Sequence, residues 1–208
     1  MKVIFVRHAE TEWNECGVIQ GHKDSPVTIR GTLETLALLT VLNNAAFPVE
    51  CVFTSPLGRA WQMGQALAGH FQCPLVIEEA LKEQSFGQYE GMTKAYLARE
   101  YPSQFLALFS RNAEFCPPGG ESLASASQRV IGFLHEKMAT TTHQTFCVVT
   151  HGHVMQGMLA LLKEGNIDQF NRYAQPNASY TVLETCGGEE FTLRWGIASH
   201  LLKLPNVE

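Results

Sequence analysis

Long apolar runs, an excess of positive charge and closely spaced cysteine pairs are all missing from this sequence of 208 residues. No apolar run approaches the roughly 20 residues that a membrane-spanning helix needs, so we expect no membrane partner. The 15 Lys and Arg residues are outnumbered by 20 Asp and Glu residues, and the formal charge of -5 argues against nucleic acid as a partner. Any anion must therefore be bound by a local cluster of positive groups.

The six cysteines are scattered, and no two of them have the spacing of a zinc site or a redox dithiol. We therefore expect no metal and no cofactor, and we interpret the cysteines as reduced, mostly buried thiols of a cytoplasmic protein. The N-terminal segment reaches Arg7 and His8 before the apolar core of a signal peptide, about 7 to 15 residues long, can form. Export through such a signal is not expected.

Short apolar runs rich in β-branched and aromatic residues predict the buried strands of a parallel sheet. These runs are residues 3–6, 51–54, 75–77 and 146–150. Longer stretches with helical spacing lie between them, at residues 31–42, 59–70, 122–138 and 154–163. Strands that alternate with helices predict an α/β fold, here a three-layer α/β/α sandwich with a mostly parallel central sheet.

Two late segments, residues 179–185 and 190–197, alternate like strands around a turn-forming stretch at 186–189. They predict an antiparallel hairpin at one edge of the sheet. The region 84–120 is too long and too rich in Phe, Tyr and Pro for a simple crossover, so we interpret it as an inserted helical cap. No linker or repeat divides the chain, which predicts a single domain over residues 1–208.

Polar side chains follow three of the predicted strands, at the sheet edge where α/β proteins bind ligands. Arg7 and His8 follow the first strand, His151 follows the strand at 146–150, and Arg59 begins the helix after the strand at 51–54. Guanidinium groups bind phosphate oxygens bidentately, and a neutral imidazole can attack phosphorus. The free N–H groups at the start of the helix near Arg59 are expected to favour the same anion.

Six ordered segments resemble motifs of the histidine phosphatase superfamily, which includes the cofactor-dependent phosphoglycerate mutases. The segments are RHAETEWN at 7–14, QGHKDSP at 20–26, SPLGRA at 55–60, LKE at 81–83, PGGES at 118–122 and THG at 150–152. The resemblance implies that His8 is the nucleophile that becomes phosphohistidine. It also implies that Arg7, Arg59 and His151 bind the phosphoryl oxygens and stabilise charge in the transition state.

The same resemblance assigns roles to further residues of the site. Asn14 would contact the phosphate, and Gln20, Gly21 and Gly152 would line its pocket. Glu83 would protonate the leaving alkoxide and then accept a proton from the attacking water. A small phosphorylated compound is the partner that these roles imply, and a homodimer formed through a sheet edge is left open.

Two positions depart from the usual pattern or go beyond it. Ala9 replaces the glycine that usually follows the nucleophile, so the backbone at this position is expected to avoid positive φ values. His153 follows the His-Gly pair by one residue, and we interpret it as a solvent-facing side chain at the start of a helix in preference to a substrate contact.

The segment after Glu83 is similar to the short form found in the phosphatase branch, which favours hydrolysis over a mutase reaction. The predicted cap holds only three cations, Lys94, Arg99 and Arg111. It also holds seven aromatic residues, most of which we interpret as the core of the cap: Phe86, Tyr89, Tyr96, Tyr101, Phe105, Phe109 and Phe115. An apolar roof of this kind suits a ring-bearing leaving group, and α-ribazole-5'-phosphate is one expected substrate.

Three other functions remain open at the level of sequence. The first is a cofactor-dependent phosphoglycerate mutase, and the second is a catalytically silent module that binds a phosphorylated ligand. The third is a metal hydrolase that uses His8, His151, His153 and Asp24. The cations Arg7 and Arg59 beside a metal dication argue against this third function.

Overall fold

The computed structural model describes residues 1–185 and 190–205, and a six-stranded sheet in the order β3-β2-β4-β1-β5-β6 forms its centre. The strands are β1 (Lys2–Arg7), β2 (Cys51–Thr54), β3 (Leu75–Ile77), β4 (Thr145–Thr150), β5 (Tyr180–Thr185) and β6 (Phe191–Ile197). The first four are parallel, and β5 is antiparallel to both of its neighbours. The mostly parallel sheet with an antiparallel hairpin at one edge is confirmed, while the predicted turn at 186–189 lies outside the described residues.

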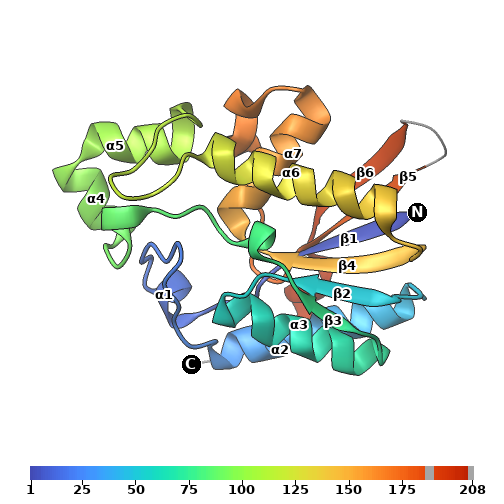
Figure 1. Cartoon of the computed structure of the whole chain (residues 1–208). Coiled ribbons are helices and arrows are strands. Elements are labelled where there is room, and N and C mark those ends of the chain that lie inside the picture. Colours follow the sequence, from blue (N-terminus) through green and yellow to red (C-terminus); the bar gives the residue numbers. More distant parts are fainter. Residues whose placement is uncertain (186–189, 206–208) are drawn as a thin grey trace.

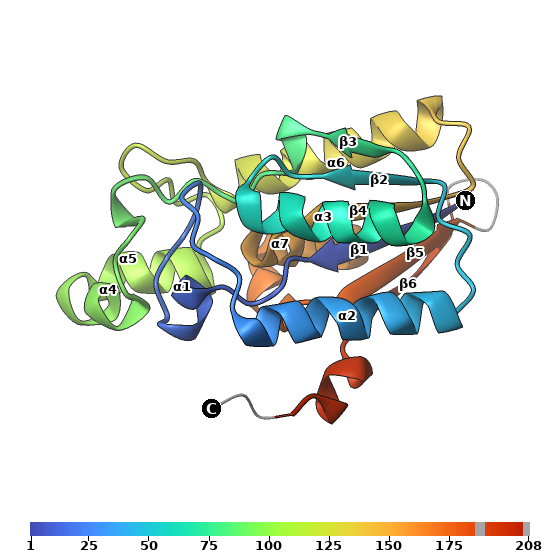
Figure 2. The same ribbon diagram turned by 90° about the horizontal axis from the view of Figure 1, so that it is seen from below.

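Helices cover both faces of the sheet, so the predicted three-layer sandwich is confirmed (Figures 1 and 2). On one face lie α6 (Leu123–Thr140) and α7 (Gly152–Glu164), and on the other lie α2 (Ile29–Asn44) and α3 (Gly58–Phe71). Thr28 and Ser122 cap α2 and α6, since each side chain accepts a hydrogen bond from a backbone N–H of the first helical turn. Short helical segments complete the chain at α1 (Glu12–Glu15), η1 (Glu79–Leu81), η4 (Ile167–Tyr173) and η5 (Ser199–Lys203).

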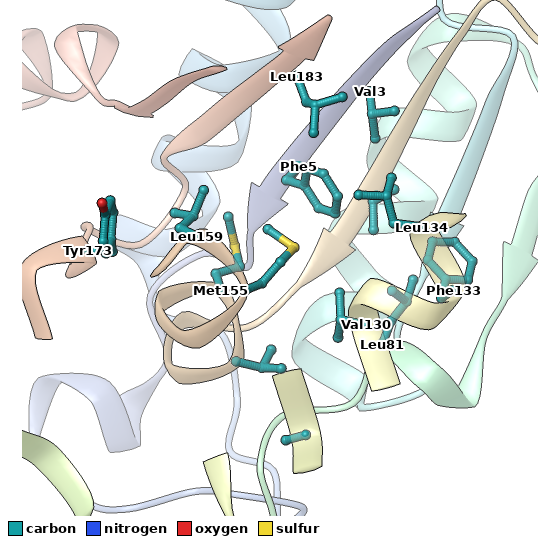
Figure 3. Packing of buried hydrophobic residues seen from close by; sticks show 14 of the residues in the cluster. Val3, Phe5, Leu81, Val130, Phe133, Leu134, Met155, Leu159, Tyr173 and Leu183 are labelled. Atoms are coloured by element: carbon teal, nitrogen blue, oxygen red, sulfur yellow. The ribbon is translucent and has the colours of Figure 1, made fainter. Parts of the chain in front are cut away.

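Every residue of β4 is buried, because the strand lies between β2 and β1 and is covered on both faces. Figure 3 shows Phe5 of β1 and Leu134 of α6 among the side chains packed between the sheet and the helices α6 and α7. Phe53 adds edge-on contacts with Phe133 and Phe146, at ring-centroid distances of 5.5 and 5.4 Å. These contacts pack β2 against α6 and β4, while the backbone pairing of β1, β2 and β4 sets where their carboxyl ends lie.

The predicted cap segment, residues 84–120, lies beyond the carboxyl ends of β1, β2 and β4 (Figures 1 and 2). It contains η2 (Gly87–Tyr89), α4 (Lys94–Glu100), α5 (Pro102–Leu106) and the π-helical turn η3 (Ala107–Arg111). Phe86 and Tyr89 are buried in a hydrophobic cluster of their own, as the core interpretation predicts. Tyr96 and Tyr101 do not fit this interpretation, because they are 42% and 41% exposed.

The cysteines of the described residues are all free, but fewer of them are buried than predicted. Cys51 and Cys147 are buried within the strands, whereas Cys16 and Cys116 are exposed in connecting segments and Cys73 is half-buried. Burial raises the pKa of the Cys51 thiol to about 11. Within residues 1–185 and 190–205, no helix is long and apolar enough to cross a membrane.

Replacement of Leu134 by Ala is expected to lower the free energy of unfolding by about 2 to 5 kcal/mol, because the fully packed α6 side chain leaves a cavity against the sheet. Leu36→Ala is the matched control, since Leu36 is a helical leucine of α2 that is 55% exposed. Its expected effect is within about 0.5 kcal/mol. Urea unfolding of both variants measures the difference, and equal losses would contradict this packing.

Candidate active site

The carboxyl ends of three neighbouring strands bring the predicted site residues together. Arg7 is the last residue of β1 and pairs in register with Thr150, the last residue of β4. His8 and His151 follow these two residues directly, and their ring centroids lie 5.2 Å apart. Arg59, which enters from the first turn of α3 after β2, places its Nε atom 3.3 Å from Nε2 of His8. Four side chains from three segments distant in the sequence therefore meet in one small volume.

The ring of His8 is held in a single tautomer by its backbone contact. Nδ1 lies 2.7 Å from the carbonyl oxygen of Ala9, which can only accept a hydrogen bond, so Nδ1 bears the proton. Nε2 then has a free lone pair, towards which Arg59 donates. Burial first, and the charges of Arg59 and Arg7 next, hold the pKa of His8 well below its ordinary value of 6.5. The backbone at Ala9 is outside the positive-φ region, as predicted.

Asp24 holds Arg59 in place from the opposite side. Its carboxylate accepts hydrogen bonds from Nη1 of Arg59 at 2.6 Å and from the backbone N–H of Gly58 at 2.7 Å. Nη1 and Nη2 of Arg59 also donate to the carbonyl oxygens of Lys23 and Gly21, each at 2.8 Å. The expectation that the N–H groups of this helix start face the ligand is wrong, because Asp24 already occupies them.

Arg7 lies against the first residue of α7. Its Nη1 atom donates to the backbone oxygen of Gln175, and its Nε atom is buried without a partner among the described residues. A Cβ atom at Gly152 would lie 2.8 Å from Cζ of Arg7, so a side chain at this position would displace the guanidinium group. Burial lowers the pKa of Arg7, while Glu83 and Glu34 raise it.

His151 is fully buried beside His8. Its Nε2 atom lies 2.8 Å from Oγ of Ser55, whose oxygen also accepts a hydrogen bond from the backbone N–H of Leu57 at 3.3 Å. Its Nδ1 atom has no partner among the described residues. Burial, followed by the charge of Arg59, lowers the pKa of His151 well below 6.5. Both histidines are therefore neutral near pH 7.

Asn14 is oriented by three donors that all use its side-chain oxygen. Oδ1 accepts from the backbone N–H and the hydroxyl of Thr11 and from Nδ2 of Asn177, at 3.1 to 3.2 Å. The amide NH₂ of Asn14 is thus left to donate to a ligand. The side chain of Gln20 is held between Thr11 and Ser25, so it braces this loop.

Glu83 lies at the amino terminus of α7, where three backbone N–H groups donate to its carboxylate. Oε1 accepts from Gln84 at 3.0 Å and from Val154 at 2.8 Å, while Oε2 accepts only from His153, at 3.0 Å. Oε2 therefore has a lone pair that no backbone group occupies. The α7 start thus binds a protein carboxylate, as the α3 start does.

The interpretation of His153 as a solvent-facing residue is wrong. The side chain is buried, its ring stacks on Phe86 and makes a tilted contact with Phe109, and burial lowers its pKa to about 4. No pattern in the sequence distinguishes this position, because its burial depends on the cap segment folding over α7. The sequence likewise does not predict the contacts of Asp24 with Arg59, of Asn177 with Asn14 and of Gln84 with His153.

A cavity of about 380 Å³ opens between these residues and the cap segment. The predicted site residues that line it are Arg7, His8, Asn14, Gln20, Gly21, Arg59, Glu83 and Gly152. The rest of the wall combines apolar and amide side chains with His153 and the cation Lys94. The apolar and amide residues are Val18, Ile19, Phe86, Phe105, Phe109, Gln156, Asn171, Ala174 and Gln175. The ammonium of Lys94 lies 5.2 Å from the centre of the Phe109 ring. In the part of the chain that the structure describes, no group of three or more His, Cys, Asp or Glu side chains is arranged to hold a metal ion.

Comparison with known proteins identifies the family of the chain. The family model of the histidine phosphatase superfamily (branch 1) matches residues 3–198. The chain is 31% identical over 201 residues to phosphoserine phosphatase 1 of Hydrogenobacter thermophilus, and the match covers 97% of this chain and 94% of that protein.

Solved structures show the same fold over nearly the whole chain. Bacillus stearothermophilus YhfR is 27% identical with a TM-score of 0.88, covering 96% of this chain and 98% of its own. The α-ribazole phosphatase from Shigella flexneri is 25% identical with a TM-score of 0.81, covering 99% of this chain and 100% of its own. The chain therefore belongs to the histidine phosphatase superfamily, and it is a phosphomonoesterase of the phosphoglycerate mutase-like type.

Proposed function

We propose that the protein hydrolyses a small organic phosphate through a phosphohistidine formed at Nε2 of His8. The observation that carries the proposal is the state of this ring: Nδ1 holds the proton, the pKa is lowered by burial and by two arginines, and the Nε2 lone pair faces the cation that would bind a phosphoryl oxygen. A neutral imidazole beside buried guanidinium groups is suited to attack phosphorus.

In the first step, Nε2 of His8 forms a bond to phosphorus while the bond from phosphorus to the leaving oxygen breaks. Arg7, Arg59 and Asn14 donate N–H groups to the phosphoryl oxygens, and Nδ1 of His151 is the free ring atom for a further contact. Arg59 exchanges its contact with His8 for one with the ligand. These donors are held in place before substrate binds, which reduces the reorganisation that the transition state requires.

Glu83 supplies the proton that the leaving alkoxide needs. Glu83 lines the cavity, and its Oε2 atom, which accepts only one backbone hydrogen bond, would carry this proton. In the second step Glu83 takes a proton from water, the water oxygen attacks phosphorus, and the bond to Nε2 breaks to release inorganic phosphate. The imidazole returns to its starting state, so no other reactant is consumed.

The outer part of the cavity is suited to an organic leaving group. Phe86, Phe105 and Phe109 form an apolar wall, whereas Gln156 and Asn171 offer amides that can bind hydroxyl groups. A ribose or another small polar group attached to a ring matches this division, and α-ribazole-5'-phosphate is a substrate of this kind. The name of the relative from Hydrogenobacter thermophilus makes phosphoserine a second compound to test.

Hydrolysis is favoured over the mutase reaction by the charge of the cavity wall. A mutase must rebind doubly phosphorylated acids, yet Lys94 is the one cation besides Arg7 and Arg59 among the described residues that line the cavity. We also propose that residues 1–208 act as one histidine phosphatase domain, in which residues 84–120 form the cap over the leaving group.

His8→Ala is expected to abolish turnover, because the variant lacks the imidazole proposed to accept the phosphoryl group from the substrate. Incubation of the wild type with ³²P-labelled substrate, followed by a rapid quench in base, should trap an acid-labile phosphoenzyme. The variant should trap none. Acid-labile label on the His8→Ala protein would place the phosphoryl group on another residue.

Glu83→Gln is expected to lower kcat/KM strongly for alkyl phosphates and only slightly for p-nitrophenyl phosphate, because a nitrophenolate leaves without protonation. A loss of about 10²-fold for the alkyl substrate is the scale of general acid catalysis. Steady-state kinetics with both substrates measures the ratio. Equal losses would show that Glu83 is not the acid.

The kcat/KM value for an aryl phosphate is expected to persist as the pH falls through 6.5 and to be lost only at lower pH. Protonation of His8 removes the attacking lone pair, and burial together with Arg59 and Arg7 places this protonation below the ordinary value of 6.5. Measurements from pH 4 to 8, corrected for the ionisation of the substrate, test the direction. An acid limb centred at or above pH 6.5 would contradict it.

A further inference from the structure

The ring of His153 is held rigidly by aromatic contacts from three parts of the chain. It stacks on Phe86 and makes a tilted contact with Phe109, both at ring-centroid distances of 5.5 Å, and it meets Phe170 of η4 edge-on at 5.6 Å. The side chain is 7% exposed. Its position is therefore set by packing between α7 and the cap segment.

Gln84 determines which nitrogen of His153 bears the proton. The Nε2 atom of Gln84 donates to the backbone oxygen of Glu121 at 2.8 Å, which turns its Oε1 atom towards Nδ1 of His153 at 2.7 Å. Because this Oε1 atom can only accept, Nδ1 of His153 donates. The buried bond thus joins the loop after Glu83 to the first turn of α7.

The same two residues hold the carboxylate of Glu83 through their backbones. The N–H groups of Gln84 and His153 donate to Oε1 and Oε2, each at 3.0 Å. A closed ring of contacts results, in which the side-chain bond between His153 and Gln84 fixes the spacing of the two backbone donors. We name this pair, His153 and Gln84, the acid clamp.

We propose that the acid clamp positions Glu83 for proton transfer to the leaving group. His22 and Thr150 also hold this loop, since His22 contacts the backbone oxygen of Glu83 at 2.9 Å and Thr150 donates to that of Leu81 at 2.7 Å. The clamp adds the link to α7, the helix whose amides hold the carboxylate. Since small displacements of a reacting group reduce the rate steeply, loss of this link should weaken acid catalysis. The inference rests on the proposed role of Glu83.

The test compares His153→Phe with wild type. Phe keeps a ring for Phe86, Phe109 and Phe170 to pack against but removes the donor to Gln84. We expect kcat/KM for the alkyl phosphate that the wild type hydrolyses fastest to fall about tenfold, and kcat/KM for p-nitrophenyl phosphate to change less than about twofold. General damage to the site would lower both values together, so the ratio separates positioning from folding. Because His153 also lines the cavity, the same selectivity must appear in Gln84→Met, at a residue outside the cavity wall.

Gln84→Met removes the other half of the clamp and serves as the second variant, in case His153→Phe does not fold. His135→Phe is the matched control, because His135 is an exposed histidine of α6. It should change neither substrate. Near-ultraviolet circular dichroism of each variant checks that the aromatic packing is kept.

Glu83→Gln, measured on the same two substrates, separates failure of this inference from failure of the proposed function. If Glu83→Gln is selective for the alkyl substrate and both clamp variants are not, the clamp is refuted while the acid role stands. If Glu83→Gln is itself unselective, the acid role is refuted and the clamp with it. Selective losses in Glu83→Gln and in a folded Gln84→Met variant support the positioning role, whereas a selective loss in His153→Phe alone would indicate a contact with the leaving group and refute it.

Discussion

The burial of two guanidinium groups beside a neutral imidazole is the constraint on which the rest of the site depends. A buried charge is costly unless other groups bind it, and here Asp24 and backbone oxygens bind part of each arginine. Among the described residues, some N–H groups of both side chains still lack an acceptor. Burial first, and then the charges of the two arginines, lower the pKa of His8, and a bound phosphate, as proposed, would supply the missing negative charge.

The amino termini of α3 and α7 support the site by binding carboxylates of the protein. The amino terminus of α3 is occupied by Asp24 and that of α7 by Glu83, so both helices bind carboxylates of the protein. The dipole of α3 stabilises the residue that holds Arg59, and the dipole of α7 stabilises the residue proposed as the acid. In the proposed mechanism, phosphate binding is then left to side chains and not to the N–H groups of these two helix starts.

The cap segment forms part of the cavity wall, where the proposed leaving group would lie. Its phenylalanines pack on His153 of α7 and also face the cavity, so the same aromatic contacts close the site and hold the acid loop. Changes in the cap would therefore alter both substrate choice and the position of Glu83. This coupling is a physical reason why one scaffold can serve many phosphate esters while its phosphate-binding residues stay the same.

The sequence alone determined the parallel strands, the helices between them and the meeting of His8, Arg59 and His151, because buried strands have a distinctive composition and parallel strands end at one edge of the sheet. It could not determine that His153 is buried or that Asp24 holds the start of α3. Those facts depend on segments far apart in the chain, namely the loop at Asp24 meeting α3 and the cap segment closing over α7. The spacing of apolar residues in the sequence predicts which face of a helix or strand is apolar. Only the packed tertiary structure determines which polar groups bind one another.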